Sequence, residues 1–143
     1  ESVIRVIGAD ATCSAIYTDF SSIAGATSRL EYVFSDAGLS AWGKGTDSHM
    51  NTTLGAGDTA AELKVDVSAR RSAGDESFTL IRYSSLNGRF GKVIVEDDTW
   101  GAMQAGDRGN LAPGEYCLDY EGDDGHAVRL YYNNIRQNAV DDR

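Results

Sequence analysis

Cysteine is the residue type with the clearest chemical meaning in this sequence, because it occurs only as Cys13 and Cys117. Their wide separation excludes a CxxC redox motif, a zinc knuckle and a haem attachment site, which all need closely spaced cysteines. A bridge between them would close a loop of about 100 residues and restrict the unfolded chain by about 4–5 kcal/mol in the entropy model. Both cysteines lie in strand-like segments of a chain with an extracellular composition, so we expect a disulfide. The alternative is two buried free thiols that act as small core hydrophobes.

Other catalytic signals are sparse. The histidines, His49 and His126, lie far apart and have no Cys or Asp cluster at ligand spacing, so we expect neither to bind a metal. The sequence has no GxSxG, HExxH or Walker motif. Carboxylate pairs are abundant, but a glycosidase needs two carboxylates with separated pKa values in a cleft, which a sequence does not show. We therefore predict a protein without catalytic activity and without a cofactor.

The acidic segment 119–125 has oxygen ligands at alternate positions, beginning with Asp119. An EF-hand loop needs glycine at its sixth position and a bidentate glutamate at its twelfth. Here the sixth residue is Asp124 and the twelfth is Leu130. The GDDG sequence between two alternating strands is more typical of a hairpin turn, in which Asp and Gly adopt the tight φ angles. We predict a turn without a metal, with calcium bound near Asp119–Asp124 as the alternative.

Length and charge limit the classes of function. With 143 residues and 15.3 kDa, the chain suits a single domain, residues 1–143, with a sizeable core. The net charge of −9 and the lack of a basic stripe disfavour nucleic acid and anionic lipid as partners. No apolar run is long enough for a membrane span. The abrupt start at Glu1 is typical of a processed secreted protein, and Asn51 begins an Asn-Thr-Thr glycosylation acceptor.

The spacing of glycines between short β-rich runs predicts an all-β fold. Several runs alternate apolar and polar residues with period two, as half-buried antiparallel strands do. The predicted strands are residues 3–7, 12–18, 29–34, 62–67, 78–83, 92–96, 115–120 and 127–132. About eight short strands at this spacing predict an antiparallel β-sandwich, with residues 133–143 as a loose tail. The predicted core residues are Leu63, Val65, Val67, Leu80, Val93, Val95, Leu118, Val128 and Leu130.

A long loop at residues 97–110 precedes the strand of Cys117, and long loops in compact domains are often functional. We predict that this loop binds a partner protein, because tryptophan and arginine are enriched at interface hot spots. The alternative is that Trp100 and Met103 fold back onto the core. The candidate partner-binding residues are Trp100, Met103, Asp107, Arg108, Gly109 and Asn110.

Two motifs near the C-terminus form one pattern: residues 114–120 (GEYCLDY), then a polar turn and residues 128–134 (VRLYYNN). This pattern resembles the C-terminal hairpin of the ToxA-like fungal effectors. Residues 12–14 (TCS) resemble the N-terminal cysteine strand of that family, and residues 92–95 (KVIV) with the loop 97–110 resemble the strand and exposed loop that precede this hairpin. A toxin of the family carries an Arg-Gly-Asp triplet in that loop, tied to host-cell entry. This chain has Arg108-Gly109-Asn110 instead, so the adhesion-like function does not carry over.

The resemblance implies a secreted, non-enzymatic β-sandwich in which Cys13 and Cys117 are bridged. It implies a pro-protein trimmed after a dibasic site, although Arg70-Arg71 inside the domain is expected to be a structured surface pair. The implied partner is a host plant protein, with another effector or an immune receptor as further partners. The implied location is the host apoplast or the host cytosol.

Two other classes of function stay open at this point. The first is a secreted carbohydrate-binding module, with or without calcium, which needs a platform of exposed aromatic side chains. The seven tyrosines and two tryptophans of the chain are numerous enough to form one. The second is a pilus or adhesin subunit, which would be an incomplete sandwich with an unpaired groove.

Overall fold

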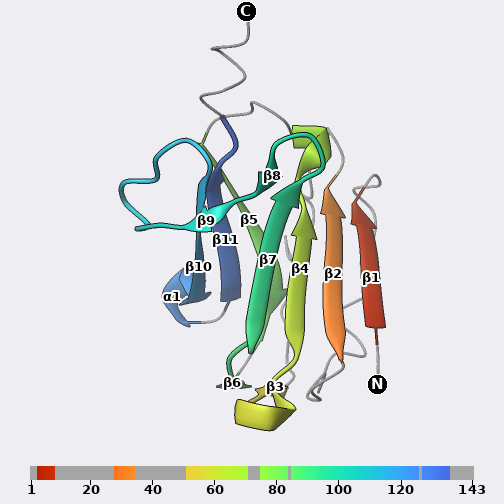
Figure 1. Ribbon diagram of the computed structural model, residues 1–143. Coiled ribbons are helices and arrows are strands. Elements are labelled where there is room, and N and C mark those ends of the chain that lie inside the picture. Colours follow the sequence, from red (N-terminus) through yellow and green to blue (C-terminus); the bar gives the residue numbers. More distant parts are fainter. Residues whose placement is uncertain are drawn as a thin grey trace, which may run out of the picture.

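A computed structural model describes residues 3–8, 28–34, 51–70, 75–83, 85–125 and 127–135, and these residues form three β-sheets (Figure 1). The all-β class is therefore confirmed. Every predicted strand that falls within the described residues is present. The predicted strand at 12–18, Cys13, His49, His126 and the tail beyond residue 135 lie outside the described residues. The described residues already contain eleven strands, because the short strands β3, β6, β8 and β9 add to the predicted ones.

The first sheet has the strand order β1-β2-β4-β7-β8. Its strands are β1 (Val3–Gly8), β2 (Arg29–Phe34), β4 (Glu62–Asp66), β7 (Lys92–Asp97) and β8 (Gly101–Ala102). Strands β1, β2, β4 and β7 pair in parallel, and β8 pairs with β7 antiparallel. The prediction of an antiparallel fold is wrong for this sheet. Alternation specifies two faces but no direction, and the connections between these strands are long enough to return the chain to the same end.

The second sheet has the order β5-β11-β10-β9. It contains β5 (Asp75–Arg82), β11 (Ala127–Asn133), β10 (Glu115–Glu121) and β9 (Gln104–Ala105). Strands β5, β11 and β10 are antiparallel as predicted, whereas β9 is parallel to β10. The predicted turn between β10 and β11 is present as a single helical turn, α1 (Gly122–Gly125), and Gly125 has a positive φ of 88°.

A small third sheet lies at one end of the molecule and pairs β3 (Asn51–Gly55) in parallel with β6 (Ser85–Gly88) (Figure 1). The glycosylation candidate Asn51 is the first residue of β3. The two strands end in close contact, because a Cβ on Gly88 would lie 2.0 Å from the carbonyl oxygen of Gly55. Gly88 also has a φ of 91°, which side chains other than glycine rarely adopt. Short 3-10 helices occupy residues Gly57–Thr59 and Ser68–Arg70.

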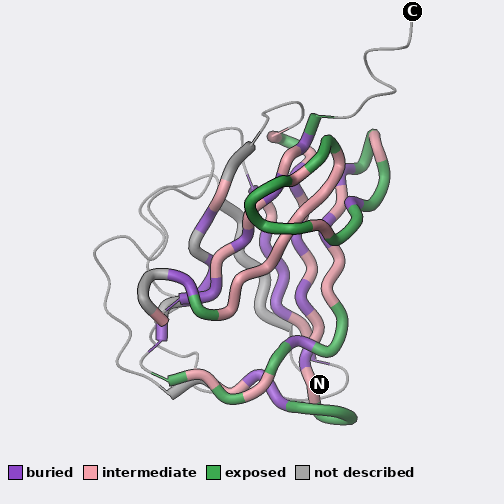
Figure 2. The backbone as a smooth tube through the Cα atoms, turned by 90° about the vertical axis from the view of Figure 1, so that its left-hand side faces the viewer, coloured by how far each residue is buried: buried purple, intermediate pink, exposed green. Residues whose placement is uncertain are grey.

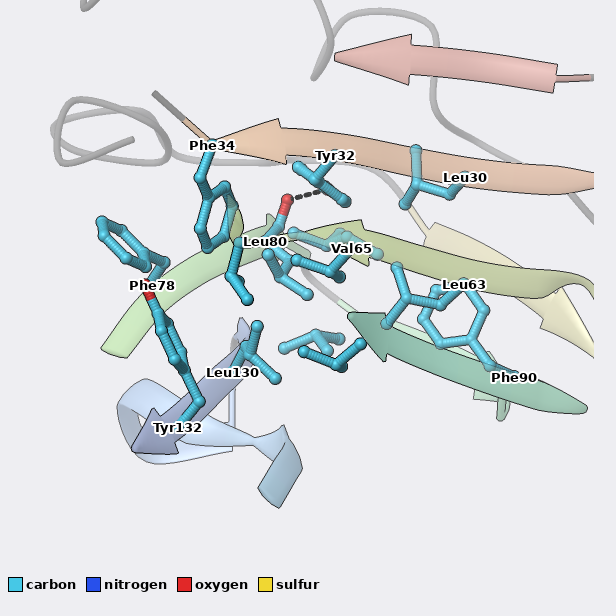
Figure 3. Packing of buried hydrophobic residues seen from close by; sticks show 14 of the residues in the cluster. Leu30, Tyr32, Phe34, Leu63, Val65, Phe78, Leu80, Phe90, Leu130 and Tyr132 are labelled. Carbon is cyan, nitrogen blue, oxygen red and sulfur yellow. Dashed lines mark hydrogen bonds between the residues drawn. The ribbon is translucent and has the colours of Figure 1, made fainter. Parts of the chain in front are cut away.

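The two larger sheets pack their apolar faces against each other and enclose the core (Figures 2 and 3). In the first sheet, in-register pairing aligns Leu30 with Leu63 and Tyr32 with Val65, so each row of the face is apolar. Strand β4 keeps the predicted alternation, with Leu63 and Val65 buried between half-buried polar residues. The predicted core is confirmed. Leu63, Val65, Val67, Leu80, Val95, Val128 and Leu130 are buried, and Val93 and Leu118 pack against them half-buried.

A hydrogen bond across the core links the two sheets. The register between β5 and β11 shifts at one point, where Arg129 faces Thr79 and Val128 faces Ile81. Leu80 is the residue skipped by this bulge, and its carbonyl oxygen accepts a hydrogen bond from the hydroxyl of Tyr32 on β2 (Figure 3). Burial raises the pKa of Tyr32, because the tyrosinate charge would have no water around it.

Candidate functional site

The predicted binding loop is a structured segment that crosses from the first sheet to the second. We call residues 98–114 the crossover loop. Along it the backbone amide of Met103 donates to the carbonyl of Val95 on β7 at 2.7 Å. Further on, the amide of Gly106 donates to the carbonyl of Tyr116 on β10 at 2.7 Å. The crossover loop is therefore hydrogen-bonded to the edges of both sheets, as strands β8 and β9.

The crossover loop begins with a tight turn after β7. The buried carboxylate of Asp97 accepts hydrogen bonds from the backbone amides of Thr99 at 2.7 Å and Trp100 at 3.2 Å. The amide of Asp98 donates to the hydroxyl of Ser68 at 2.9 Å. These bonds satisfy the backbone donors of the turn, as Asp side chains often do. Trp100 lies in this turn and is half-buried.

Met103 does not contribute to an exposed surface, so its prediction as a partner-binding residue is wrong. Its side chain is 5% exposed and belongs to the core. The reason is its position between β8 and β9, where the chain passes from one sheet to the other and the side chain fills the space between them. The alternative interpretation, in which Met103 packs onto the core, is confirmed.

The remaining predicted residues lie together at the outer end of the crossover loop. We call residues 107–113 the loop tip. Asp107, Arg108, Gly109 and Asn110 are all exposed, and the amide of Asn110 donates to the carbonyl of Asp107 at 3.0 Å to close a turn. The far side of the tip is also held, because the amide of Ala112 donates to the Glu115 carboxylate at 3.0 Å. The side chain of Asn133 on β11 donates to the carbonyl of Leu111 at 3.2 Å.

Arg108 folds back onto the outer face of the second sheet. Its Nη1 donates to Oδ2 of Asp119 on β10 at 2.9 Å. Its Cζ lies 4.5 Å from the centre of the Tyr131 ring on β11, within the range of a cation–π contact. The side chain of Arg108 is nevertheless 58% exposed, so the ion pair with Asp119 is partly screened by water.

Cys117 lies directly across from Tyr131 in the pairing of β10 with β11 and is half-buried. Burial raises the pKa of the Cys117 thiol, and the nearby charge of Asp119 raises it further. The charge of Arg108 and a hydrogen bond from the Arg108 backbone act in the opposite direction. Cys117 is present as a thiol in the structure, and Cys13 lies outside the described residues, so the disulfide stays a prediction.

Both oxygens of the Asp119 carboxylate have hydrogen-bond partners. One oxygen pairs with Arg108, and the other accepts a hydrogen bond from the backbone amide of Glu121 at 2.9 Å. Within the described part of the chain, no three His, Cys, Asp or Glu side chains gather in a way that could hold a metal ion.

Asp119 and Tyr131 were not expected from the sequence as partners of Arg108. The alternation of the hairpin puts both residues on its outer face, so that part was predictable. The missing information was the path of the crossover loop over that face, which depends on strand pairing far from residue 108.

A second polar network, also missed, crosses the outer face of the first sheet. The Arg29 guanidinium donates to Glu62 at 2.6 Å and to Glu31 at 2.9 Å, and Lys92 lies 3.9 Å from Glu62. Hydrogen bonds to Glu31 and then Glu62 raise the pKa of Arg29. Only the parallel register, which aligns Arg29, Glu62 and Lys92, brings these charges together.

No protein-family model, curated protein or solved structure matches this chain. No helix in the described residues has the length and hydropathy to cross a membrane. The class that the fold and site define is an all-β domain with a structured, exposed loop that joins its two main sheets.

Proposed function

We propose that the protein is a secreted effector of the ToxA-like kind, which binds a host plant protein through the loop tip and catalyses no reaction. One observation carries this proposal: the tip is exposed, yet its backbone is hydrogen-bonded to β10 and β11 of the second sheet, through Glu115 and Asn133. A loop that is already ordered loses little conformational entropy when a partner binds. The plant host and the secreted location in this proposal are inferred from the resemblance of short sequence motifs to those of ToxA-like effectors.

The proposed contact surface consists of Asp107, Gly109, Asn110 and Pro113, which are all exposed. The charge of the whole chain, −9, favours a basic partner, because opposite charge accelerates association. Association is therefore expected to slow as the salt concentration rises.

The charged and nucleophilic groups beside the tip support binding better than catalysis. The thiolate is the reactive form of cysteine, and Cys117 has no thiolate to offer when it is bridged to Cys13, as this proposal has it. The carboxylate of Asp119 is held by Arg108 and by a backbone amide, which leaves it poorly placed to accept a proton from a substrate. In this proposal the Cys13–Cys117 disulfide joins the N-terminal region to β10 and stabilises the domain outside the cell.

The carbohydrate-binding alternative gains no support from the described side chains. Among them, Ile135 is the one large hydrophobic residue that is exposed. Tyr131 faces outward from β11, but the Arg108 guanidinium lies over its ring. A sugar ring could stack on Tyr131 only after Arg108 moved away.

The proposal is tested with two matched variants, Asn110→Lys at the loop tip and Asn87→Lys on β6. Both asparagines are exposed, and each variant adds the same charge. The measurement is the lowest infiltrated concentration that produces a response in host leaves, with the melting temperature of each variant as a control. Asn110→Lys is expected to raise this threshold at least about tenfold, as truncation of a hot-spot contact does. Equal thresholds for the two variants and the unmodified protein would place the binding surface elsewhere.

A further inference from the structure

Arg108 differs from the neighbouring residues of the loop tip in where its side chain lies. Its guanidinium contacts Asp119 on β10 and Tyr131 on β11. Two side chains on two adjacent strands therefore hold one residue of the tip. The next residue, Gly109, has open space around it, since a Cβ at that position would meet no atom within 4 Å.

We propose that Arg108 is a positioning residue, which latches the loop tip against the outer face of the second sheet in the conformation that binds the partner. The inference rests on the proposed function, because it assigns Arg108 a role within the same surface. In this role Arg108 does not touch the partner, as an interface arginine is expected to do. It instead holds the neighbouring residues of the loop tip in position for their own contacts with the partner.

The ring to which Arg108 binds is itself held in place. The guanidinium of Arg129 lies 5.7 Å from the centre of the Tyr131 ring. Arg129 also donates to the hydroxyl of Ser77 on β5 at 2.9 Å. The Tyr131 ring is thus contacted by two guanidinium groups, Arg108 from the crossover loop and Arg129 from its own strand. The contact with Arg129 restricts the position of the ring against which Arg108 packs.

The latch is tested with Arg108→Ala, Asp119→Asn and the double variant. Asp119 lies on β10 outside the loop tip, and its side chain is only 19% exposed, so a partner on the tip has little access to it. The Asp119→Asn change keeps an oxygen that can accept the hydrogen bond from the Glu121 amide, but it removes the charge that holds Arg108. The Arg108 side-chain protons report directly on the latch, because stacking on Tyr131 shifts their NMR resonances.

Arg108→Ala removes both the ion pair and the cation–π contact and is expected to raise the host-response threshold by about three- to tenfold. Asp119→Asn removes the ion pair alone, so it is expected to loosen the latch and to raise the threshold by less, up to about fivefold. The double variant is expected to equal Arg108→Ala, because the ion pair that Asp119→Asn removes is already lost in Arg108→Ala. Arg108→Lys is expected to recover part of the activity by restoring the ion pair.

Two results would overturn the inference. If Asp119→Asn releases Arg108 in the NMR spectrum but leaves the threshold unchanged while Arg108→Ala raises it, then Arg108 contacts the partner directly. If neither variant raises the threshold, the latch has no part in binding. The Asn110→Lys variant separates these failures from failure of the proposed function, since it removes tip contacts without touching the latch.

Discussion

Replacing Tyr32 with Phe tests whether the hydrogen bond across the core is a main link between the two sheets. The change removes only the hydroxyl, which donates to the carbonyl oxygen of Leu80 on the opposite sheet. Leu80 is skipped by the bulge between β5 and β11, so no residue of β11 lies directly opposite it. Tyr32 is 1% exposed and Leu80 3%, so water cannot replace the hydroxyl without opening the core.

The expected cost follows from leaving a buried acceptor without a donor, about 1–3 kcal/mol in the free energy of unfolding. For a chain of this length, that corresponds to a fall in melting temperature of roughly 3–12 °C. The assay is urea denaturation at pH 7 of the unmodified protein and of Tyr32→Phe. The matched control is Tyr131→Phe, which removes the hydroxyl of a half-buried tyrosine on the outer face and should change stability by less than about 0.5 kcal/mol.

Raising the pH tests the same bond independently. Burial raises the pKa of Tyr32 above its ordinary value of 10.0. Above that value the unfolded tyrosine loses its proton while the folded one keeps it, so the stability contributed by Tyr32 is complete below pH 10 and falls as the pH rises. The loss reaches up to about 1.4 kcal/mol per pH unit. Tyr32→Phe lacks this loss, so the stability difference between the two proteins is expected to shrink above pH 10.

Equal stability of Tyr32→Phe and the unmodified protein at pH 7 would refute the claim that this bond links the sheets. A stability difference that stays constant between pH 7 and about pH 11 would refute the burial of the hydroxyl.

Three further predictions concern the core, the glycines and the cysteines. Leu130→Ala is expected to cost about 2–5 kcal/mol in denaturant unfolding, because Leu130 is 0% exposed and its loss leaves a cavity; a change below about 1 kcal/mol would contradict this packing. Gly88→Ala is expected to lower the melting temperature, whereas Gly109→Ala should not, since only the first Cβ would clash with backbone. Mass spectrometry without reductant is expected to find Cys13 and Cys117 joined, and two alkylatable thiols in the native protein would exclude the bridge.

The strands and their buried faces were predictable from the sequence. In β4 the buried residues Leu63 and Val65 alternate with polar ones, and the same period of two marks β11. A period of two is a local property of an extended chain, because successive side chains point to opposite faces. The turn between β10 and β11 was equally readable, since its glycines and aspartates favour tight backbone angles.

The candidate site was predictable only in outline. A long loop carrying Asp107, Arg108 and Asn110 was visible in the sequence, and these residues are exposed as expected. The burial of Met103 was not visible, because it depends on the point at which the chain passes from one sheet to the other. The contacts of Arg108 with Asp119 and Tyr131 were not visible either, because they depend on how the loop folds over a hairpin.

The sequence by itself determined which segments are strands, which of their residues face the core and where one turn must lie, because these properties arise from neighbouring residues. The tertiary structure alone decided that β1, β2, β4 and β7 run parallel. It also decided that the Leu80 carbonyl, at a bulge, accepts a hydrogen bond from Tyr32, and that the Arg108 guanidinium lies over the ring of Tyr131. An alternating strand buries the same face in either direction. Its direction and its partners depend on the path of the connecting chain, which no local pattern records.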